Sequence, residues 1–531
     1  MTRKVIPYSG MKGVSRLFAA YVTDYGRLSP YYAGDWREDR SYEAVAQNLT
    51  TSPIDRTVLV DVLEEQNLGW NNGHLASQLR DPHSLAVVTG QQVGIFGGPL
   101  YTLYKALTAI RLAERLSQIL ARPVIPVFWI EGGDHDLDEV KGVTFPGKQI
   151  RYKGHEQPEI GNLGSVGRLT FKEDIDRVVT ELREVLPDTS FRGDVFATHY
   201  VAYSQGVTFT DAFARTLTSL LGSGSMVFMN PEDCRLKQLA APLLRRELRE
   251  YNTTHAALQA TSAALEKDYH AQVHVNPGNV FMLSDSGREA LDPTGNGYKA
   301  RFSGGMIPLD GIQNISPCNL SPNVVMRPLV QDSLLPTVAY VAGPGEIAYF
   351  AQFKSLYTWA KRPMPIIFPR VSLTVIEPRV AKLMQRHNLS ADELRHETSE
   401  LMRRRVLEGT ELEHAFEKAA IALDTCVDGL RPVVTAVDST LRPTVEAMRA
   451  QWGKELSKLQ QRAERAEKRR HEQMRAQIER CKQALYPSGS FQERELPALY
   501  YLVKYGEDFL DQVRSGLDIE STSQHQLLTL S

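Results

Sequence analysis

A strand, a glycine-rich turn and a helix follow one another near residue 90, and this order restricts the chain to α/β architectures. The apolar run Leu85–Val88 leads into the turn Thr89–Pro99, TGQQVGIFGGP, and then into the helix-like segment Leu100–Leu120. Glycines let the backbone approach a ligand, and the N–H groups that open a helix bind phosphate or carboxylate. The turn is neither GxGxxG nor a Walker loop, because no GK[ST] follows. It predicts a small-ligand site, and an ordinary tight turn is the alternative.

Short apolar runs alternate with helix-like segments over much of the chain. The runs at Val124–Ile130, Met226–Met229, Thr337–Val341 and Pro365–Phe368 are bounded by Gly and Pro and separated by segments of helical period. Such runs are typical of strands in a parallel sheet that helices cover on both faces. We therefore predict an α/β fold with a Rossmann-like parallel sheet over 1–377, whose ligands bind at the carboxyl ends of the strands.

Other segments of this core interrupt the alternation. Residues 1–84 are predicted to be mainly helical. Residues 270–325, where short β-like pieces alternate with turn signals such as DPTGNG, are predicted to form an inserted lobe. Further strands are expected at Val140–Phe145 and Val324–Leu329, and a single helix at Ile347–Ala360.

A coiled-coil arm is predicted over 378–485, where glycine is rare and Lys, Arg, Glu, Gln, Ala and Leu dominate. Apolar residues recur there at spacings of three and four between Val445 and Leu485, so one face of a long helix needs a partner helix. The helix-like run 392–430, which we expect Gly429 and Pro432 to end, supplies an antiparallel partner. The segment after this arm, 486–531, is predicted to pack back on the core or the arm.

Composition narrows the classes of function. The chain has 531 residues, enough for two or three domains, and its formal net charge of −2 gives no pull toward nucleic acid or anionic membrane. No apolar run approaches the length of a membrane span. Cys234, Cys318, Cys426 and Cys481 are scattered without a CxxC motif, so we expect reduced thiols in a cytoplasmic protein rather than a disulfide framework.

An acidic segment, EGGDHDLDEV at 131–140, directly follows one of the predicted strands. Its titratable residues at six consecutive positions are Asp134, His135, Asp136, Asp138 and Glu139. A histidine flanked by carboxylates can be held in one tautomer and act as an acid, a base or a phosphate contact. The same oxygen atoms and imidazole can bind a divalent metal. A solvated acidic loop is the structural alternative.

A second glycine turn, AGPGE at 342–346, is expected to face the first across the sheet. Arg327, Gln331 and Asp332 are expected in a polar turn before it. Glu346 in the first turn of a helix either caps that helix or binds a ligand. A structural ion pair with Asp332 is the alternative to a ligand contact for Arg327.

Four motifs in order give the chain a specific resemblance. They read TGQQVGIFGGPLYTLYKA, PVFWIEGGDHDLDEV, RPLVQDSLLPTVAYVAGPGEIAYFAQFK and SFQER…YGEDF. The chain resembles the BshC family, the cysteine-adding enzymes of bacillithiol biosynthesis, over nearly its whole length. The resemblance implies a nucleotidyl-transferase type of Rossmann fold, as in class I aminoacyl-tRNA synthetases, and a homodimer formed through the coiled-coil arm.

The reaction implied by the resemblance adds L-cysteine to the amine of glucosaminyl malate in the last step of bacillithiol biosynthesis. Amide formation from a free carboxylate is uphill in water, so we expect ATP to activate the cysteine carboxylate by adenylation, with Mg present only with the nucleotide and no metal ligands on the protein. A catalytically silent binding scaffold and a metal-dependent hydrolase that uses the DHDLDE cluster are the alternatives.

The resemblance and the motifs together predict three sets of site residues. Expected catalytic residues are His135, Asp134, Asp136 and Lys105. Expected substrate-binding residues are Thr89, Gly90, Gln91, Gln92, Gly98, Pro99, Tyr104, Asp138, Arg327, Gln331, Asp332, Gly343 and Glu346. A nucleotide is expected near Gln492, Arg494, Tyr505 and Gly506.

Roles follow for the main groups. Backbone N–H groups at 90–92 and 98–100 are expected to hold an anion, and His135 to assist proton transfer from the attacking amine. The chain departs from the family pattern at Tyr104, where relatives commonly carry His, and at Gly133 and Leu137 in the acidic segment. Lys141 and Gly142 replace a usual Asn-His pair, so His135 is the strongest imidazole candidate.

Overall fold

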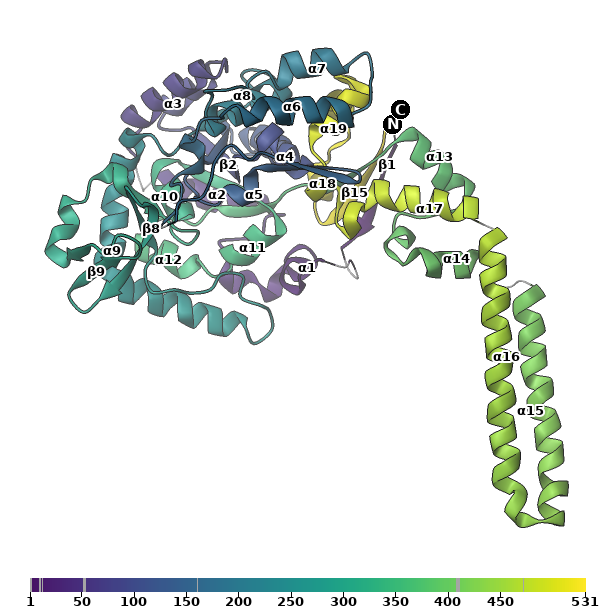
Figure 1. Cartoon of the computed structure of the whole chain (residues 1–531). Helices are drawn as coiled ribbons and strands as arrows, with labels where there is room; N and C mark the ends of the chain where they lie inside the picture. Colours follow the sequence, from purple (N-terminus) through teal and green to yellow (C-terminus); the bar gives the residue numbers. More distant parts are fainter. Residues whose placement is uncertain are drawn as a thin grey trace. The chain divides into compact units, whose positions relative to one another are not determined.

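The computed structural model describes residues 2–8, 11, 13–50, 54–159, 161–406, 411–470 and 472–531. The chain forms two compact units, Met1–Val375 with Gln492–Ser531, and Ile376–Phe491. We call the first the core unit and the second the arm unit. Figure 1 shows the elements of both.

A five-stranded parallel sheet organises the core unit. Its order is β13 (Ile366–Pro369), β12 (Thr337–Ala342), β2 (Leu85–Gln92), β3 (Val124–Glu131) and β6 (Val227–Met229). In chain order, β2, β3 and β6 lie next to one another toward one edge of the sheet. The chain then returns to the other side of β2, where β12 and β13 lie. This reversal lies between β2 and β12, the position at which sheets of this class bind ligands. The Rossmann-like α/β prediction is confirmed.

Local sequence explains the elements next to this sheet. The helix α4 (Leu100–Ile119) begins directly after Pro99, whose fixed φ suits a helix start, and packs against β2 and β3. The helix α9 (Cys234–Leu265) begins at Asp233, whose side chain accepts a hydrogen bond from the N–H of Arg235. The helix α4 begins where the sequence predicts it, at Leu100.

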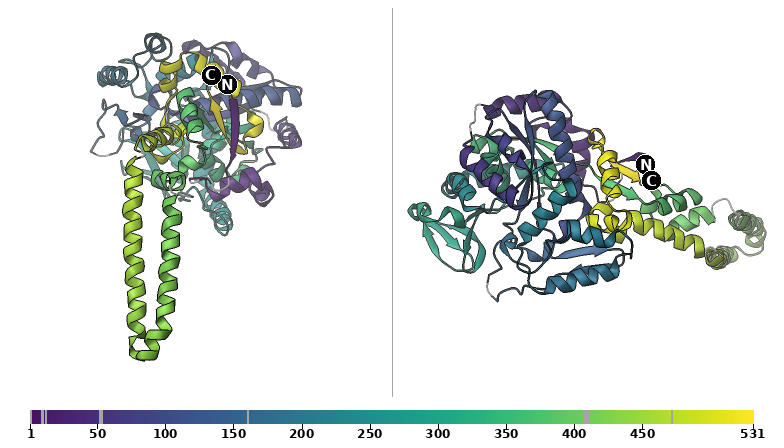
Figure 2. Two further views of the ribbon diagram at one scale, coloured as in Figure 1. Left: turned by 90° about the vertical axis from the view of Figure 1, so that its right-hand side faces the viewer. Right: turned by 90° about the horizontal axis from the view of Figure 1, so that it is seen from above.

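The N-terminal residues correct one expectation. The strand β1 (Thr2–Pro7) pairs antiparallel with β15 (Gln524–Thr529), which also borders β14 (Leu373–Ile376) in a three-stranded sheet. The prediction that residues 1–84 are mainly helical therefore fails at their start. The two chain ends lie side by side (Figure 2). Pairing between opposite ends of a chain leaves no local periodicity that would predict it.

Three further elements differ from the predictions. The prediction of a strand at Val324–Leu329 is wrong. A helix, α10 (Arg327–Leu334), starts within this segment and has a proline in its first turn. The single helix predicted up to Ala360 is two helices, α11 (Pro344–Phe350) and α12 (Lys354–Ala360). The strand expected at Val140–Phe145 exists over a shorter range, as β4 (Gly142–Phe145), but it pairs with β5 (Lys148–Arg151) apart from the main sheet and follows a short helix, α5 (Leu137–Val140).

The 270–325 segment contains an antiparallel sheet, which we call the small sheet. Its order is β10 (Met306–Pro308), β9 (Gly297–Ala300), β8 (Gly287–Thr294), β7 (Val280–Ser284) and β11 (Leu320–Pro322). Short strands joined by tight turns produce the alternation of β-like pieces and turn signals in the sequence.

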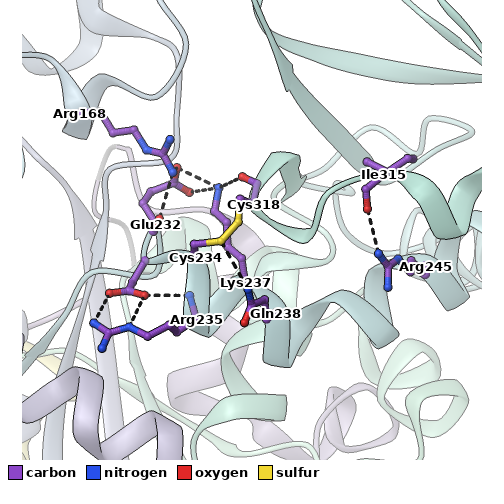
Figure 3. The surroundings of a disulfide bond; sticks show 10 residues. Arg168, Glu232, Cys234, Arg235, Lys237, Gln238, Arg245, Ile315 and Cys318 are labelled. Atoms are coloured by element: carbon purple, nitrogen blue, oxygen red, sulfur yellow. Dashed lines mark hydrogen bonds and ion pairs between the residues drawn. A yellow bond between two sulfur atoms is a disulfide. The ribbon is translucent and has the colours of Figure 1, made fainter.

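A disulfide joins Cys234, in the first turn of α9, to Cys318, shortly before β11, with the two Cα atoms 4.9 Å apart (Figure 3). The expectation of four reduced thiols is wrong for these two residues. They lie 84 positions apart in the sequence, so only the tertiary fold brings them together. Cys426 is a free exposed thiol and Cys481 a free buried one.

The arm unit contains a helical hairpin of α15 (Glu411–Val437) and α16 (Arg442–Arg470), which lie side by side in Figures 1 and 2. The predicted break at Gly429 and Pro432 is wrong, since α15 continues through both residues. Packing against a partner helix compensates for the hydrogen bond that a proline removes. None of the helices that the structure describes is long and apolar enough to cross a lipid bilayer.

Candidate functional site

A cavity of about 650 Å³ lies at the carboxyl ends of β2, β3 and β12, where the strand order reverses. Gly90, Gln91 and Gln92 end β2, Glu131 ends β3, and Gly343 follows β12. The small sheet, α10, α11 and the segment after the arm complete the wall. Its charged residues are Lys105, Glu131, Asp134, Arg288, Asp292, Arg301, Arg327, Glu346, Arg370 and Arg494. We call this space the main cavity.

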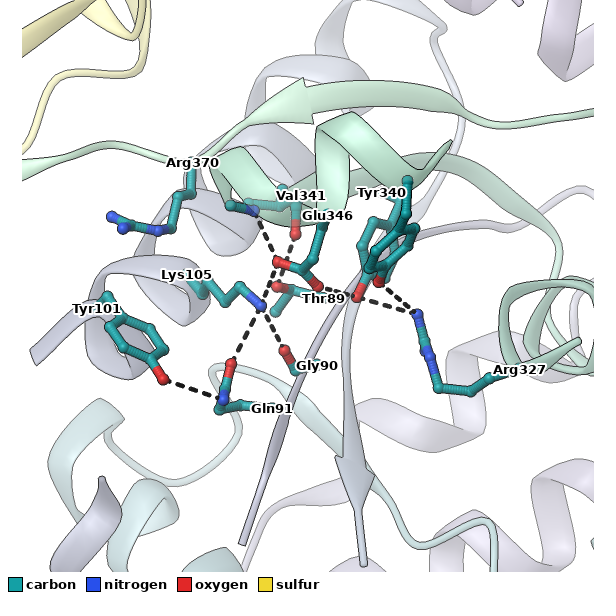
Figure 4. A network of polar contacts seen from close by, with 12 residues as sticks. Thr89, Gly90, Gln91, Tyr101, Lys105, Arg327, Tyr340, Val341, Glu346 and Arg370 are labelled. Carbon is teal, nitrogen blue, oxygen red and sulfur yellow. Dashed lines mark hydrogen bonds and ion pairs between the residues drawn. The ribbon is translucent and has the colours of Figure 1, made fainter. Parts of the chain in front are cut away.

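Lys105 connects the two glycine turns from α4 (Figure 4). Its Nζ lies 2.5 Å from Oε2 of Glu346, 2.7 Å from the carbonyl oxygen of Gly90 and 3.3 Å from Oε1 of Gln91. An ammonium group has three N–H donors, so these contacts use all of them. Burial lowers the pKa of Lys105, and the carboxylate of Glu346 opposes this change. Lys105 therefore holds the end of β2 against the start of α11.

Glu346 both caps a helix and lines the main cavity. Its Oε2 accepts a hydrogen bond from the N–H of Gly343 at 2.7 Å, and its Oε1 accepts one from the hydroxyl of Tyr340 at 2.7 Å. Burial raises its pKa, but the charge of Lys105 and the hydrogen bonds from Lys105, Gly343 and Tyr340 together outweigh burial and hold the pKa below its ordinary value. The capping and site interpretations of Glu346 are thus compatible.

Arg327 lies at the N-terminus of α10 and lines the main cavity. Its Nη1 donates to Oε1 of Gln331 at 3.1 Å, and its Nη2 lies 3.4 Å from the hydroxyl of Tyr340. Asp332 is instead bound by the hydroxyl of Tyr357, at 2.5 Å, and by the amide of Gln331, at 2.9 Å. Burial raises the pKa of Asp332 to about 6. In the described part of the chain, neither Gln331 nor Asp332 lines the main cavity, although the sequence predicts both as site residues.

The acidic segment contributes two of its carboxylates to the wall, those of Glu131 and Asp134. Asp134 accepts hydrogen bonds from the side-chain amide of Gln92 at 2.9 Å and from the N–H of His135 at 2.7 Å, and its Oδ1 lies 3.7 Å from Nη1 of Arg288. Burial raises the pKa of Asp134, but the imidazole of His135, the charge of Arg288 and the hydrogen bonds from Gln92 and the His135 N–H together outweigh burial and hold the pKa well below its usual range. Asp136 caps α5, and the exposed Asp138 pairs with Lys141 at 2.6 Å. Among the described wall residues, neither of these two acids appears.

His135 lies beside the main cavity and is not one of the described residues that line it. Its Nδ1 is 3.3 Å from Nη1 of Arg288 and 3.4 Å from Oδ1 of Asp134, and both partners are wall residues. A guanidinium only donates and a carboxylate only accepts, so the tautomer of the ring decides which of them Nδ1 binds. The imidazole is half-buried and lies one contact away from the cavity.

The turn after β2 faces protein rather than the main cavity. The N–H of Gly98 donates to the carbonyl of Ile95, and the N–H of Leu100 donates to the carbonyl of Leu496 at 2.8 Å. The expectation that amides at 98 and 100 bind an anion is therefore wrong, because the fold already uses them. Pro99 forms an isolated bridge with Pro497, and Tyr104 is fully buried. Within the described chain, Gly98, Pro99 and Tyr104 lie outside the cavity wall.

Of the four residues predicted near a nucleotide, one lines the main cavity and three lie outside its described wall. Arg494 lines the main cavity. The side chain of Gln492 is buried and exchanges hydrogen bonds with the backbone of Val375. Gly506 has a φ of +64° and ends the helix α19 (Ala498–Tyr505), where an added Cβ would lie 2.8 Å from Phe191. In the described wall, Gln492, Tyr505 and Gly506 do not appear.

The sequence interpretation misses Arg288, Arg370 and Glu131. Arg288 is held on β8 by Ser321 and by the carbonyl of Pro322, and Arg370 forms a buried pair with Glu493 at 2.7 Å. Arg288 lies in the strand β8 and Arg370 directly follows β13. A single charged residue carries no periodic signal, so the sequence offers no reason to select the two arginines. Glu131 is different, because it is the first residue of the acidic segment and its position after β3 could have identified it.

The charge of the wall indicates the ligand class. Its described residues include six Lys and Arg side chains and four Asp and Glu side chains. Arginine presents several N–H donors in a plane that matches carboxylate or phosphate. Among the residues that the structure describes, no group of three or more His, Cys, Asp or Glu side chains could hold a metal ion. The cavity can therefore bind an anionic molecule that also carries an amine.

Comparison with known proteins covers both units. Residues 1–371 match the model for the N-terminal Rossmann-like domain of bacillithiol biosynthesis BshC, and residues 373–530 match the model for its C-terminal coiled-coil domain. A protein of Salinibacter ruber named "Putative cysteine ligase BshC" is 39% identical, over 98% of this chain and 97% of its own. Proteins of the same name from Symbiobacterium thermophilum and Chlorobaculum tepidum are 33% and 32% identical, each over at least 96% of both chains.

Proposed function

The chain belongs to the bacillithiol biosynthesis BshC family, and on this premise we propose that it joins the carboxylate of L-cysteine to the amine of glucosaminyl malate. The names of its relatives support a ligase with a role in bacillithiol biosynthesis. The amide-forming step and its substrates are our proposal. ATP as the activating reagent, a homodimer formed through the arm and a cytoplasmic location belong to the same proposal.

The cationic wall of the main cavity carries the proposal. Glucosaminyl malate has two carboxylates, and an excess of Arg and Lys over acidic residues in a concave site favours such a dianion. Arg288 and Arg494 are the residues that we assign to these carboxylates. Arg288 is nearly buried, with its side chain 9% exposed, so its contact with a carboxylate is weakly screened.

Activation of the cysteine carboxylate generates negative charge that the site must stabilise. The three donors of Lys105 are already engaged, so we assign this task to Arg327, which presents its guanidinium to the main cavity beside two tyrosine hydroxyls. Lys105 then acts as a positioning residue for the end of β2 and for Glu346.

Proton removal from the attacking amine completes the assignment. His135 is an imidazole one contact away from the main cavity, and the ionised Asp134 can orient its ring and stabilise the imidazolium that forms. The proton passes from the amine to the imidazole as the carbon–nitrogen bond forms, and the activating group leaves the carbonyl carbon.

The experiment combines purified protein, ATP, L-cysteine and glucosaminyl malate, with the thiol product detected by mass spectrometry. We expect product from the unaltered protein and a large loss of rate for His135→Ala. His83→Ala, a change at an exposed surface position, is the matched control. No product, together with an unchanged thiol profile in cells that lack the gene, would defeat the proposal.

A further inference from the structure

A second, much smaller cavity of about 30 Å³ adjoins the main cavity, and we call it the annex. Four residues line both spaces, Trp129, Glu131, Pro322 and Arg327. Glu131 and Arg327 stand at this junction with opposite charges. The annex is thus a side space behind the part of the wall to which we assign the activated carboxylate.

The walls of the annex are mostly apolar. Leu236, Ala240 and Leu244 come from α9, and Val330 and Leu334 from α10. Two charged side chains also lie there, but they neutralise each other. Nζ of Lys237 is 2.9 Å from Oε1 of Glu232, and Lys237 also contacts the carbonyl of Cys318 (Figure 3). Ser321 also lines the annex, and its hydroxyl accepts a hydrogen bond from Arg288 at 3.0 Å. Away from the junction, a group inside the annex would therefore meet mostly hydrocarbon, this hydroxyl and one closed ion pair.

The volume of the annex limits its occupant. A water-sized group needs about 10–15 Å³ of such space, so 30 Å³ holds about two non-hydrogen atoms. The side chain of cysteine, a methylene and a sulfur, has this size. Longer side chains, such as that of methionine, exceed it.

The junction between the annex and the main cavity offers one partner for the carboxylate of an amino acid and one for its α-ammonium group. The guanidinium of Arg327 is free to donate toward a carboxylate on the side of the main cavity, since its contacts to the two tyrosine hydroxyls are long, at 3.4 and 3.5 Å. The carboxylate of Glu131 accepts the indole N–H of Trp129 at 3.0 Å, which fixes its orientation. Glu131 can therefore accept hydrogen bonds from an α-ammonium group.

We propose that the annex and its junction form the subsite for the amino acid that is ligated, with the side chain of cysteine in the annex, the ammonium at Glu131 and the carboxylate at Arg327. The inference rests on the proposed function and extends it to the selection of cysteine. In this subsite, shape and apolar surface recognise the thiol, and the protein needs no metal to bind it.

The proposed subsite predicts that cysteine binds better than alanine, serine and S-methylcysteine. Alanine lacks the sulfur that fills the annex, and one missing group of this size in an apolar pocket reduces binding by about 10- to 200-fold. Serine places a hydroxyl against the apolar wall, which disfavours it by up to about 100-fold. S-methylcysteine adds a methyl group for which the annex has no room, so we expect no product from it.

Competition and activity assays on the unaltered full-length protein test this order directly. L-alanine, L-serine and S-methylcysteine are each added to the ligation reaction with cysteine, and each is tried alone as a substrate. S-methylcysteine used as readily as cysteine would overturn the inference while leaving the ligase proposal intact. Absence of product with cysteine itself would instead remove the proposed function, and the subsite with it.

A variant pair tests the position of the side chain. Ala240→Val narrows the annex from α9, and Ala241→Val adds the same methyl groups at the next residue, which is equally buried and is not one of the described annex residues. We expect the KM for cysteine to rise at least about tenfold in Ala240→Val, with the KM for glucosaminyl malate unchanged. Ala241→Val should leave both values near those of the unaltered protein. Equal KM values for cysteine in the two folded variants would contradict the assignment.

Discussion

Asp332 makes the stability of the core unit depend on pH in a direction that can be worked out. Burial raises its pKa from the ordinary value of 3.8 to about 6 in the folded protein, although Tyr357 and Gln331 donate hydrogen bonds to it. The folded state therefore binds more protons than the unfolded state between these two values. Stability falls as the pH rises through this window, because the folded state must then hold a buried charge.

The magnitude follows from the shift. Each pKa unit corresponds to about 1.4 kcal/mol, so a shift from 3.8 to about 6 predicts a loss of about 3 kcal/mol between pH 3 and pH 7. Asp332→Asn keeps the shape of the side chain and removes its titration. The free energy of unfolding of this variant, relative to the unaltered protein, should therefore rise by about 3 kcal/mol over the same interval.

Urea unfolding of the full chain at several pH values measures this difference. Tryptophan fluorescence is a suitable signal, since four of the five tryptophans, Trp36, Trp70, Trp129 and Trp359, lie in the core unit. The comparison between variant and unaltered protein cancels the titration of all other groups. A stability difference that stays constant from pH 3 to pH 7 would show that Asp332 is not a buried, destabilising charge.

Three further predictions concern charge and thiols. Lys105→Met should lower the free energy of unfolding by about 3 kcal/mol, because it leaves the carboxylate of Glu346 without its buried partner. Part of this loss should return when Glu346→Gln is added, and an additive double variant would contradict the pairing. Arg288→Gln should reduce kcat/KM for glucosaminyl malate by at least about tenfold, as expected for a lost charged hydrogen bond, while a fall confined to cysteine would argue against its role. In alkylation followed by peptide mass mapping, the exposed Cys426 should react rapidly, and Cys481 slowly, since burial raises its pKa to about 11; equal rates would refute this.

Much of the core could be predicted because its signals are local. The apolar runs that became β2, β3, β6 and β12 are short and bounded by Gly and Pro, so their period and length identify strands. The change in composition after residue 377 likewise identifies the helical arm. The two glycine turns could be placed at one edge of the sheet because the carboxyl ends of parallel strands lie together.

Local patterns failed where a contact between distant segments decides the structure. Val324–Leu329 reads as an apolar strand, but a helix starts within it because Pro328 suits a first turn and its apolar residues pack on α9. The glycine turn Thr89–Pro99 reads as an anion site, but the N–H of Gly98 donates to the carbonyl of Ile95, and the N–H of Leu100, which follows the turn, donates to the carbonyl of Leu496, about 400 positions later.

The sequence by itself determined the strands of the main sheet, the two glycine turns and the carboxylates after β3, since each depends on residues close together in the chain. The tertiary structure decided which side chains share the main cavity and the annex. It also decided that Cys234 meets Cys318 and that the first strand pairs with the last. Burial and contact between distant residues are properties of the packed chain, and they set the charges, the pKa values and the volumes on which the proposed chemistry depends.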